Sequence, residues 1–209
     1  MAYRVKEVFY SIQGEGYHAG RSTIFCRFSG CNLWNGKEEN RSSAKCSFCD
    51  TDFNNTDGEG GGIFENASEL VSHLISYWPN EKPIAIEFTG GEPLLQLDKN
   101  LILECKKKNI EITIETNGTQ IVPDGVDWVC VSPKANAPLL IDKADELKIV
   151  YPQTGIDPKD FASFNAKYFY LQAMDNDALE ENRRKTVDYC LNNQQWLLSL
   201  QIHKVLNIK

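Results

Sequence analysis

The segment "KPIAIEFTGGEP" (residues 82–93) decides the fold, because an apolar run ends there in a glycine turn. The run is typical of a buried strand, and the paired glycines at 90–91 end it. Residues 66–78 before it form a helix pattern with Asn66 as the N-cap, and residues 97–109 after it form another. The sequence therefore predicts a helix–strand–helix unit in which the strand ends at a glycine turn.

Similar strand patterns recur along the 209-residue chain, separated by helical or polar stretches. Strands that alternate with helices favour parallel βαβ units. We predict an α/β fold, an incomplete TIM-like parallel β/α barrel with about six central strands and fewer helices, since a full eight-unit barrel usually needs roughly 250 residues. Catalytic groups of such barrels lie at the carboxyl ends of the strands. The further predicted elements are strands at 4–12, 22–30, 110–118, 128–134, 146–152 and 167–175, a helix at 177–194, and a final strand with a tail at 195–208.

The composition is that of an ordinary globular protein, with 42% apolar and 24% charged residues. The net charge of −7 argues against broad binding to nucleic acid or acidic membranes, which requires basic patches. No apolar run has membrane-spanning length, and the first residues lack the features of a signal peptide. We therefore expect a cytoplasmic protein that binds neither nucleic acid nor membrane. Residues 54–62 are polar and glycine-rich, which predicts a mobile loop.

The segment "GCNLWNGKEENRSSAKCSFCDT" (30–51) holds three of the seven cysteines, Cys31, Cys46 and Cys49. Grouped cysteines in a cytosolic chain more often bind metal or do redox chemistry than form disulfides. A structural zinc site would need a fourth ligand, such as Cys26 or a histidine, and this alternative stays open. A [4Fe–4S] cluster held by three cysteines would leave one iron open to a non-protein ligand. The other cysteines fit buried apolar positions of strands or helices: Cys26, Cys105, Cys130 and Cys190.

The three cysteines, the Asp50-Thr51 pair after them and "TGGEP" at 89–93 resemble the radical S-adenosylmethionine superfamily. In that superfamily three cysteines hold a [4Fe–4S] cluster, and S-adenosylmethionine chelates the open iron and yields a 5′-deoxyadenosyl radical. The common spacing is Cys-x₃-Cys-x₂-Cys, whereas residues 32–45 separate the first two cysteines here. The resemblance implies a single radical S-adenosylmethionine core domain over 1–209, with an insertion at 32–45 in the cluster loop.

A closer resemblance, over nearly the whole chain, is to the 7-carboxy-7-deazaguanine synthase family of the queuosine and 7-deazapurine pathway. One branch of that family carries this long cysteine spacing. The resemblance implies a lyase that contracts 6-carboxy-5,6,7,8-tetrahydropterin to 7-carboxy-7-deazaguanine with release of ammonia. It also implies magnesium, an electron donor such as flavodoxin or ferredoxin, and a homodimer. The segments that carry it are "VFYSIQGEGYHAGRSTIFCRFSGCNLW" (8–34), "FTGGEPLLQ" (88–96), "IETNGT" (114–119), "VSPK" (131–134), "ELKIVY" (146–151) and "YLQAMD" (170–175).

The same resemblance implies the site residues, position by position. Cys31, Cys46 and Cys49 would hold the cluster, and the Thr51 hydroxyl would bind magnesium beside the substrate carboxylate. The residues that would contact S-adenosylmethionine are Phe48, Cys49, Asp50, Gly91, Ser132, Pro133, Lys134, Gln172, Ala173, Met174 and Asp175. The residues that would contact the pterin are Ile12, Gln13, Gly14, Glu15, Arg27, Thr89, Glu115, His203 and Lys209.

The chemistry of these side chains suits the implied substrate. Arg27 can pair with a carboxylate through two N–H groups, and Glu15 and Glu115 can accept hydrogen bonds from the amino edge of a pterin. Lys209 would contribute its main-chain carboxylate. Two alternatives stay open, a glycyl-radical enzyme activating enzyme and a zinc-binding module without catalysis. Gln13-Gly14-Glu15, Arg27 and Thr51 suit a small anionic pterin and so argue against the first alternative. The second has no use for "TGGEP" beside three cysteines.

Overall fold

The structure is a computed structural model that describes residues 2–79 and 84–209. Lys82 and Pro83, the first residues of the strand predicted at 82–93, lie outside the described residues. The elements are β1 (Tyr3–Ile12), β2 (Ser22–Phe28), the 3₁₀ helix η1 (Glu38–Ser43), β3 (Gly62–Phe64), α1 (Ala67–Ile75), β4 (Ala85–Gly90), η2 (Pro93–Leu95), α2 (Lys99–Lys107), β5 (Glu111–Thr116), β6 (Trp128–Val131), β7 (Lys143–Tyr151), η3 (Pro158–Phe161), β8 (Asn165–Ala173), α3 (Leu179–Asn192), β9 (Trp196–Ser199) and α4 (Ile202–Leu206).

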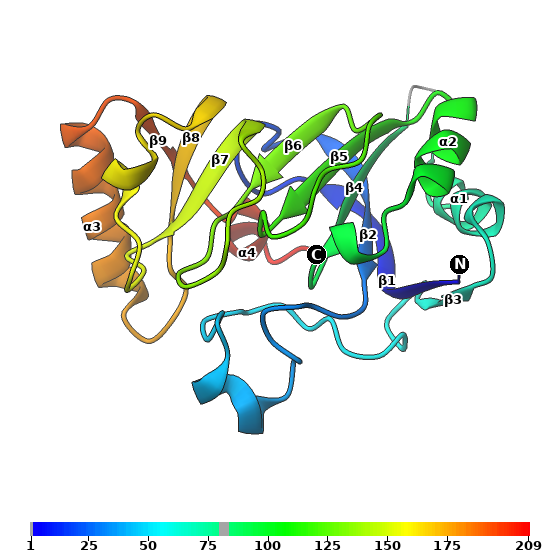
Figure 1. Cartoon of the computed structure of the whole chain (residues 1–209), viewed down its shortest axis with the longest axis horizontal. Helices are drawn as coiled ribbons and strands as arrows, with labels where there is room; N and C mark the ends of the chain where they lie inside the picture. The colour runs from blue at the N-terminus through cyan, green and yellow to red at the C-terminus, as the bar shows by residue number, and fades with distance from the viewer. Residues whose placement is uncertain (1, 80–83) are drawn as a thin grey trace.

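Within the described residues, the strands form one nine-stranded sheet in the order β3-β1-β2-β4-β5-β6-β7-β8-β9 (Figure 1). Neighbouring strands from β2 through β4 to β9 are parallel, whereas β1 is antiparallel to both β2 and β3. Between β5 and β8 the described chain contains no α-helix. The predicted fold class, an incomplete parallel β/α barrel with few helices, is confirmed. The antiparallel strands β1 and β3 extend it on one side.

The two faces of the sheet differ in chemistry, because successive side chains of a strand point to opposite faces. On β4, Ile86 and Phe88 enter an apolar core with residues of α1 and α2, whereas Glu87 lies on the other face. On β7, Leu147 and Ile149 belong to a second apolar core, to which α3 also contributes. Figure 1 shows α1 and α2 towards one end of the sheet and α3 at the β9 end. The opposite face carries the polar residues that build the candidate site.

Local sequence signals set the ends of the first two helices. Asn66 caps α1 as predicted, since its side chain accepts a hydrogen bond of 3.0 Å from the Glu69 backbone N–H. Asp98 caps α2 in the same way, accepting from the Leu101 backbone N–H at 2.9 Å. Among the described residues, no helix combines the length and apolar character needed to cross a membrane.

Two segments differ from their predictions. The glycine-rich stretch at 54–62 lies against β1, where the Val8 backbone N–H donates to the Glu59 carbonyl at 2.8 Å. The stretch predicted at 195–208 as a strand with a tail is a strand only as far as Ser199, and it continues into the short helix α4. The Ile202 backbone N–H at the start of α4 donates to the Gly14 carbonyl at 3.0 Å, which turns the chain back across the sheet towards β1.

Candidate active site

Two adjoining cavities lie at the carboxyl ends of the parallel strands. The first has a volume of about 190 Å³ and the second of about 380 Å³. They share the lining residues Glu15, Asp50, Thr51, Thr89, Glu115 and Gln201. Residues implied to contact S-adenosylmethionine line the first: Phe48, Cys49, Asp50, Gly91, Ser132, Lys134, Gln172, Ala173 and Asp175. Residues implied to contact the pterin line the second: Ile12, Gln13, Gly14, Glu15, Arg27, Thr89, Glu115, His203 and Lys209.

Pro133 and Met174, also implied as cofactor contacts, are not among the lining residues. Pro133 is buried behind the strand end. The Met174 backbone N–H donates to the Tyr151 carbonyl at 2.8 Å, and its own carbonyl accepts from Asn182 at 2.9 Å. Met174 therefore anchors the loop after β8 to its neighbours.

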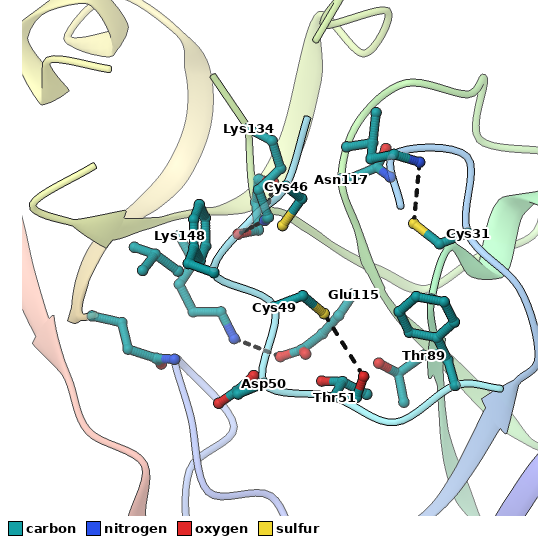
Figure 2. Close-up of a pocket in the computed structure, with 18 of the residues that line it drawn as sticks. Cys31, Cys46, Cys49, Asp50, Thr51, Thr89, Glu115, Asn117, Lys134 and Lys148 are labelled. Atoms are coloured by element: carbon teal, nitrogen blue, oxygen red, sulfur yellow. Dashed lines mark hydrogen bonds and ion pairs between the residues drawn. The ribbon is translucent and has the colours of Figure 1, made fainter. Parts of the chain in front are cut away.

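The three grouped cysteines surround the first cavity. Figure 2 shows Cys31 on one segment and Cys46 and Cys49 on another. All three are free thiols. A hydrogen bond from the Cys46 thiol lowers the pKa of Cys49 to about 6, whereas burial raises the pKa of Cys31. The Cys46 contact thus favours the thiolate of Cys49, which is the form of cysteine that binds metal.

This donor set is compatible with an iron–sulfur cluster. Among the described residues, no group of three His, Cys, Asp or Glu side chains is placed to hold one metal ion. A [4Fe–4S] cluster binds each cysteine through a different iron, so its ligands stand apart around it. Three free thiols on two segments around one cavity fit that requirement.

The turn after β4 packs directly on the Cys31 segment. A Cβ atom on Gly91 would lie 2.1 Å from the Gly30 carbonyl oxygen, so only glycine fits there. The buried Glu92 ties this turn to the end of β5, because its carboxylate accepts from the Thr116 hydroxyl at 2.7 Å and the Asn117 backbone N–H at 2.8 Å. In the sequence, the position of Glu92 between glycine and proline in "TGGEP" is the signal that could have predicted this structural role.

A buried ion pair joins the two carboxylates implied for the pterin. Lys148 on β7 is 4% exposed, and its ammonium donates to Glu15 and, at 2.7 Å, to Glu115. Glu15 also accepts from Gln172 at 3.1 Å and Gln201 at 3.0 Å. Burial alone would raise the pKa of Glu15, but the Lys148 charge and the hydrogen bonds from Lys148 and Gln201 together lower it. Lys148 has no distinctive signal in the sequence, because a charge within "ELKIVY" is expected to face solvent.

The second cavity brings together residues from opposite ends of the described chain. Arg27 donates from Nε to Glu7 at 2.9 Å, so its guanidinium is already oriented by a carboxylate. His203 packs against Gly14, where a Cβ atom would lie 2.2 Å from His203 Nδ1. Lys209 lines the same cavity. These implied substrate contacts are thus neighbours in space.

Residues 201–209, which include α4, form a strap across the site. Lys204 of the strap pairs with Asp50 at 2.6 Å and with Asp175 at 2.5 Å. The Ser11 hydroxyl of β1 donates to the Lys209 carbonyl at 2.5 Å. The strap therefore connects the cysteine-bearing segment, the end of β8 and the edge of β1. No local motif marks Lys204 for this role.

Glu87 of β4 lies beneath the cavities as a buried, uncompensated carboxyl group. Its Oε2 accepts from the Thr113 hydroxyl at 2.7 Å, while its Oε1 has no hydrogen-bond partner in the described part of the chain. Burial and the nearby Glu115 carboxylate raise the pKa of Glu87 well above its ordinary value of 4.5. Glu87 is therefore neutral at pH values where an exposed glutamate would be ionised.

This raised pKa predicts a pH-dependent gain in stability for Glu87→Gln. A carboxyl group with a raised folded pKa stabilises the fold below its unfolded pKa, and this contribution is lost as the pH rises towards the folded pKa. The loss is about 1.4 kcal/mol per pH unit within that window. We expect Glu87→Gln to match the wild type in denaturant unfolding near pH 4 and to exceed it increasingly as the pH rises above the unfolded pKa. Parallel curves for the two proteins would contradict this assignment.

Comparison with known proteins gives a family. No family model matches the chain. The 7-carboxy-7-deazaguanine synthases of Burkholderia multivorans and Bordetella pertussis are each 49% identical to it, over 209 and 210 residues, with 100% of both chains covered. The crystal structure of QueE from Escherichia coli superposes with a TM-score of 0.70 at 25% identity, covering 97% of this chain and 95% of that one. From these full-length similarities we conclude that the chain belongs to the 7-carboxy-7-deazaguanine synthase family.

Proposed function

We propose that this protein converts 6-carboxy-5,6,7,8-tetrahydropterin to 7-carboxy-7-deazaguanine, with release of ammonia, as a radical S-adenosylmethionine lyase. Family membership supports the reaction. The observation that carries it is the joining of a three-thiol cavity to a second cavity that holds Arg27, Glu15 and Glu115. A small anionic heterocycle in the second cavity would lie directly beside a cofactor in the first.

The cofactors we propose are a [4Fe–4S] cluster, S-adenosylmethionine and Mg²⁺. The cluster would be held by Cys31, Cys46 and Cys49, and Mg²⁺ by Thr51, whose side chain lines both cavities. The residues proposed for S-adenosylmethionine are those at the strand ends that line the first cavity. When bound, these groups supply the hydrogen-atom abstraction that begins the ring contraction.

The protein's own side chains would bind and orient the pterin. Glu15, kept ionised by Lys148, and Glu115 accept hydrogen bonds from the amino edge. Arg27 pairs with the carboxylate at the opposite end of the ring. Trp34 and Phe53 are buried in the wall of the first cavity, and they restrict the access of water to it.

The test is anaerobic reconstitution with iron and sulfide, followed by assay with the pterin, S-adenosylmethionine, Mg²⁺ and a chemical reductant. We expect iron and sulfide in the protein, 7-carboxy-7-deazaguanine as the product, and the S-adenosylmethionine regenerated at each turnover. A protein that takes up one zinc ion and no sulfide would support the zinc-binding module instead. A cluster-loaded protein that turns over no pterin would overturn the proposed substrate.

Thr51→Ala should remove most of the response to magnesium. Mg²⁺ binds oxygen ligands and keeps several waters, so one lost protein ligand is a large fraction of its protein contacts. We expect the magnesium-dependent part of the turnover to fall by roughly tenfold or more, as for other changes around metal sites. Thr51→Ser keeps the hydroxyl and serves as the matched control. Identical magnesium titrations for Thr51→Ala and the wild type would remove Thr51 from the site.

The remaining features we propose are organisation and partners. The chain would be a single radical S-adenosylmethionine core domain over 1–209, with 32–45 inserted in the cluster loop. It would work as a homodimer in the cytoplasm and receive its electron from a flavodoxin or a ferredoxin. Size-exclusion chromatography with light scattering tests the dimer, and turnover with each purified donor protein tests the electron source.

A further inference from the structure

The insertion at 32–45 folds back on the cysteine segment through one arginine. Arg41 lies in η1, and its Nη1 atom donates to two backbone carbonyls, those of Ser47 at 3.0 Å and Cys49 at 2.9 Å. Its Nε atom donates to Glu38 at 2.7 Å. The guanidinium carbon lies 4.2 Å from the centre of the Trp34 ring, within cation–π distance. Arg41 thus joins Trp34, near the start of the insertion, to the Cys46–Cys49 turn.

The carbonyls of Ser47 and Cys49 both accept from one nitrogen of Arg41, so the backbone of residues 47–49 curves around the guanidinium. The cysteine side chains on either side of this curl line the cavity, as Figure 2 shows for Cys46 and Cys49. Hydrogen bonds from a charged donor are about twice as strong as neutral ones. The stack on the buried Trp34 in turn fixes the guanidinium itself.

A spacer as long as 32–45 would otherwise leave the Cys46–Cys49 turn loosely placed relative to Cys31, since longer loops leave their ends more freedom. Contacts from within the insertion offset that freedom. Lys45 N–H donates to the Leu33 carbonyl at 3.1 Å, which closes the base of the insertion. Arg41 is the part of it that reaches the cysteine turn.

We propose that Arg41 is a positioning residue, whose guanidinium holds the Cys46–Cys49 turn in the conformation that receives the cluster. This rests on the proposed function only in naming the cluster as the occupant. The insertion then acts as a brace: through Arg41 it fixes the Cys46–Cys49 turn despite the long spacer between Cys31 and Cys46. The competing reading is an ordinary surface pair between Arg41 and Glu38, which the exposure of the Glu38 side chain (76%) would make weak.

The experiment compares Arg41→Gln, Arg41→Lys, Glu38→Gln and Arg183→Gln with the wild type. Arg183 is the matched control, because it makes the same i,i+3 pair with Glu180 on α3, away from the three grouped cysteines. The first readout is hydrogen exchange of peptides covering 44–53 before reconstitution. The second is the rate at which reconstituted protein loses iron to a chelator. The third is the reduction potential of the cluster.

Arg41→Gln should exchange faster at 44–53 and lose iron about tenfold faster, since a lost charged hydrogen bond of this strength corresponds to roughly that factor. It should also lower the reduction potential, because a fixed positive charge is removed. Arg41→Lys should have the reduction potential of the wild type, because it keeps the positive charge. Its hydrogen exchange at 44–53 should stay fast, since lysine lacks the planar guanidinium that stacks on Trp34 and bonds two carbonyls. Glu38→Gln and Arg183→Gln should match the wild type in hydrogen exchange at 44–53 and in the rate of iron loss.

Equal hydrogen exchange at 44–53 and equal rates of iron loss in Arg41→Gln and the wild type would show that Arg41 does not position the turn. So would an effect of Glu38→Gln as large as that of Arg41→Gln, which would assign the role to the ion pair. A wild type that takes up no iron and sulfide would instead overturn the proposed function. In that case the exchange comparison on metal-free protein still decides whether Arg41 fixes the turn.

Discussion

Cys49→Ala should abolish turnover and prevent the protein from retaining iron and sulfide. Of the three grouped thiols, Cys49 is the one whose pKa is lowered, to about 6, by a hydrogen bond from Cys46. Changes to the outer partners of metal sites commonly cost about 10–100-fold, and loss of a ligand should cost more than roughly a hundredfold. The measurements are iron and sulfide content after anaerobic reconstitution and the rate of product formation.

Cys190→Ala is the matched control for the Cys49 prediction. Cys190 is a half-buried thiol on α3, packed against the second apolar core and outside both cavities. Its loss should leave the metal content and turnover near those of the wild type, with a small decrease in stability. A Cys49→Ala protein that keeps full iron and activity, or a Cys190→Ala protein that loses both, would show that the cluster ligands are assigned to the wrong cysteines.

Lys148→Met should lower the free energy of unfolding by about 3 kcal/mol at neutral pH. Removing one partner of a buried ion pair costs about 3–5 kcal/mol, because the other charge is left uncompensated. The lower end is expected, since the Glu115 side chain is 29% exposed and can recover some hydration. The same change should also weaken pterin binding, because the Lys148 ammonium would no longer orient the Glu15 and Glu115 carboxylates. Chemical denaturation and substrate titration measure the two effects.

Lys167→Met provides the comparison for a lysine in an exposed pair. Lys167 pairs with Asp145 at 2.6 Å, but its side chain is 63% exposed, so its loss should cost less than about 1 kcal/mol. Adding Glu15→Gln to Lys148→Met should recover part of the lost stability, because it removes one of the unpaired charges. Equal costs for the two lysine variants would mean that Lys148 is not the buried counter-charge of the site.

The order and type of the main elements could be predicted because their signals are local. Asn66 before an amphipathic run marks the start of α1, and an apolar run ending in Gly90-Gly91 marks β4. The three-residue strand β3 and the five-residue helix α4 carry too few residues for a periodic pattern. Their conformation depends on pairing with β1 and on contact with Gly14, which are tertiary interactions.

The residues of the candidate site also divide into those with a local sequence signal and those without one. Cysteine spacing and "TGGEP" point to the first cavity, because these signals are compact in sequence. Lys148, Lys204 and Arg41 act through contacts with segments elsewhere in the chain, and each has the local pattern of a surface charge. On β7, Glu146 and Lys148 alternate with apolar neighbours as a solvent-exposed strand face would. That face is instead turned to the site, because the helices cover the opposite, apolar face.

The strap of residues 201–209 has a consequence for biosynthesis. Ribosomes add roughly 5–20 residues per second, so Lys204 emerges about 8–30 s after Cys49. During that interval the Asp50 carboxylate beside the cysteine turn lacks the lysine that pairs with it in the finished protein. The contact that joins the cysteine-bearing segment to the strap therefore forms late in synthesis.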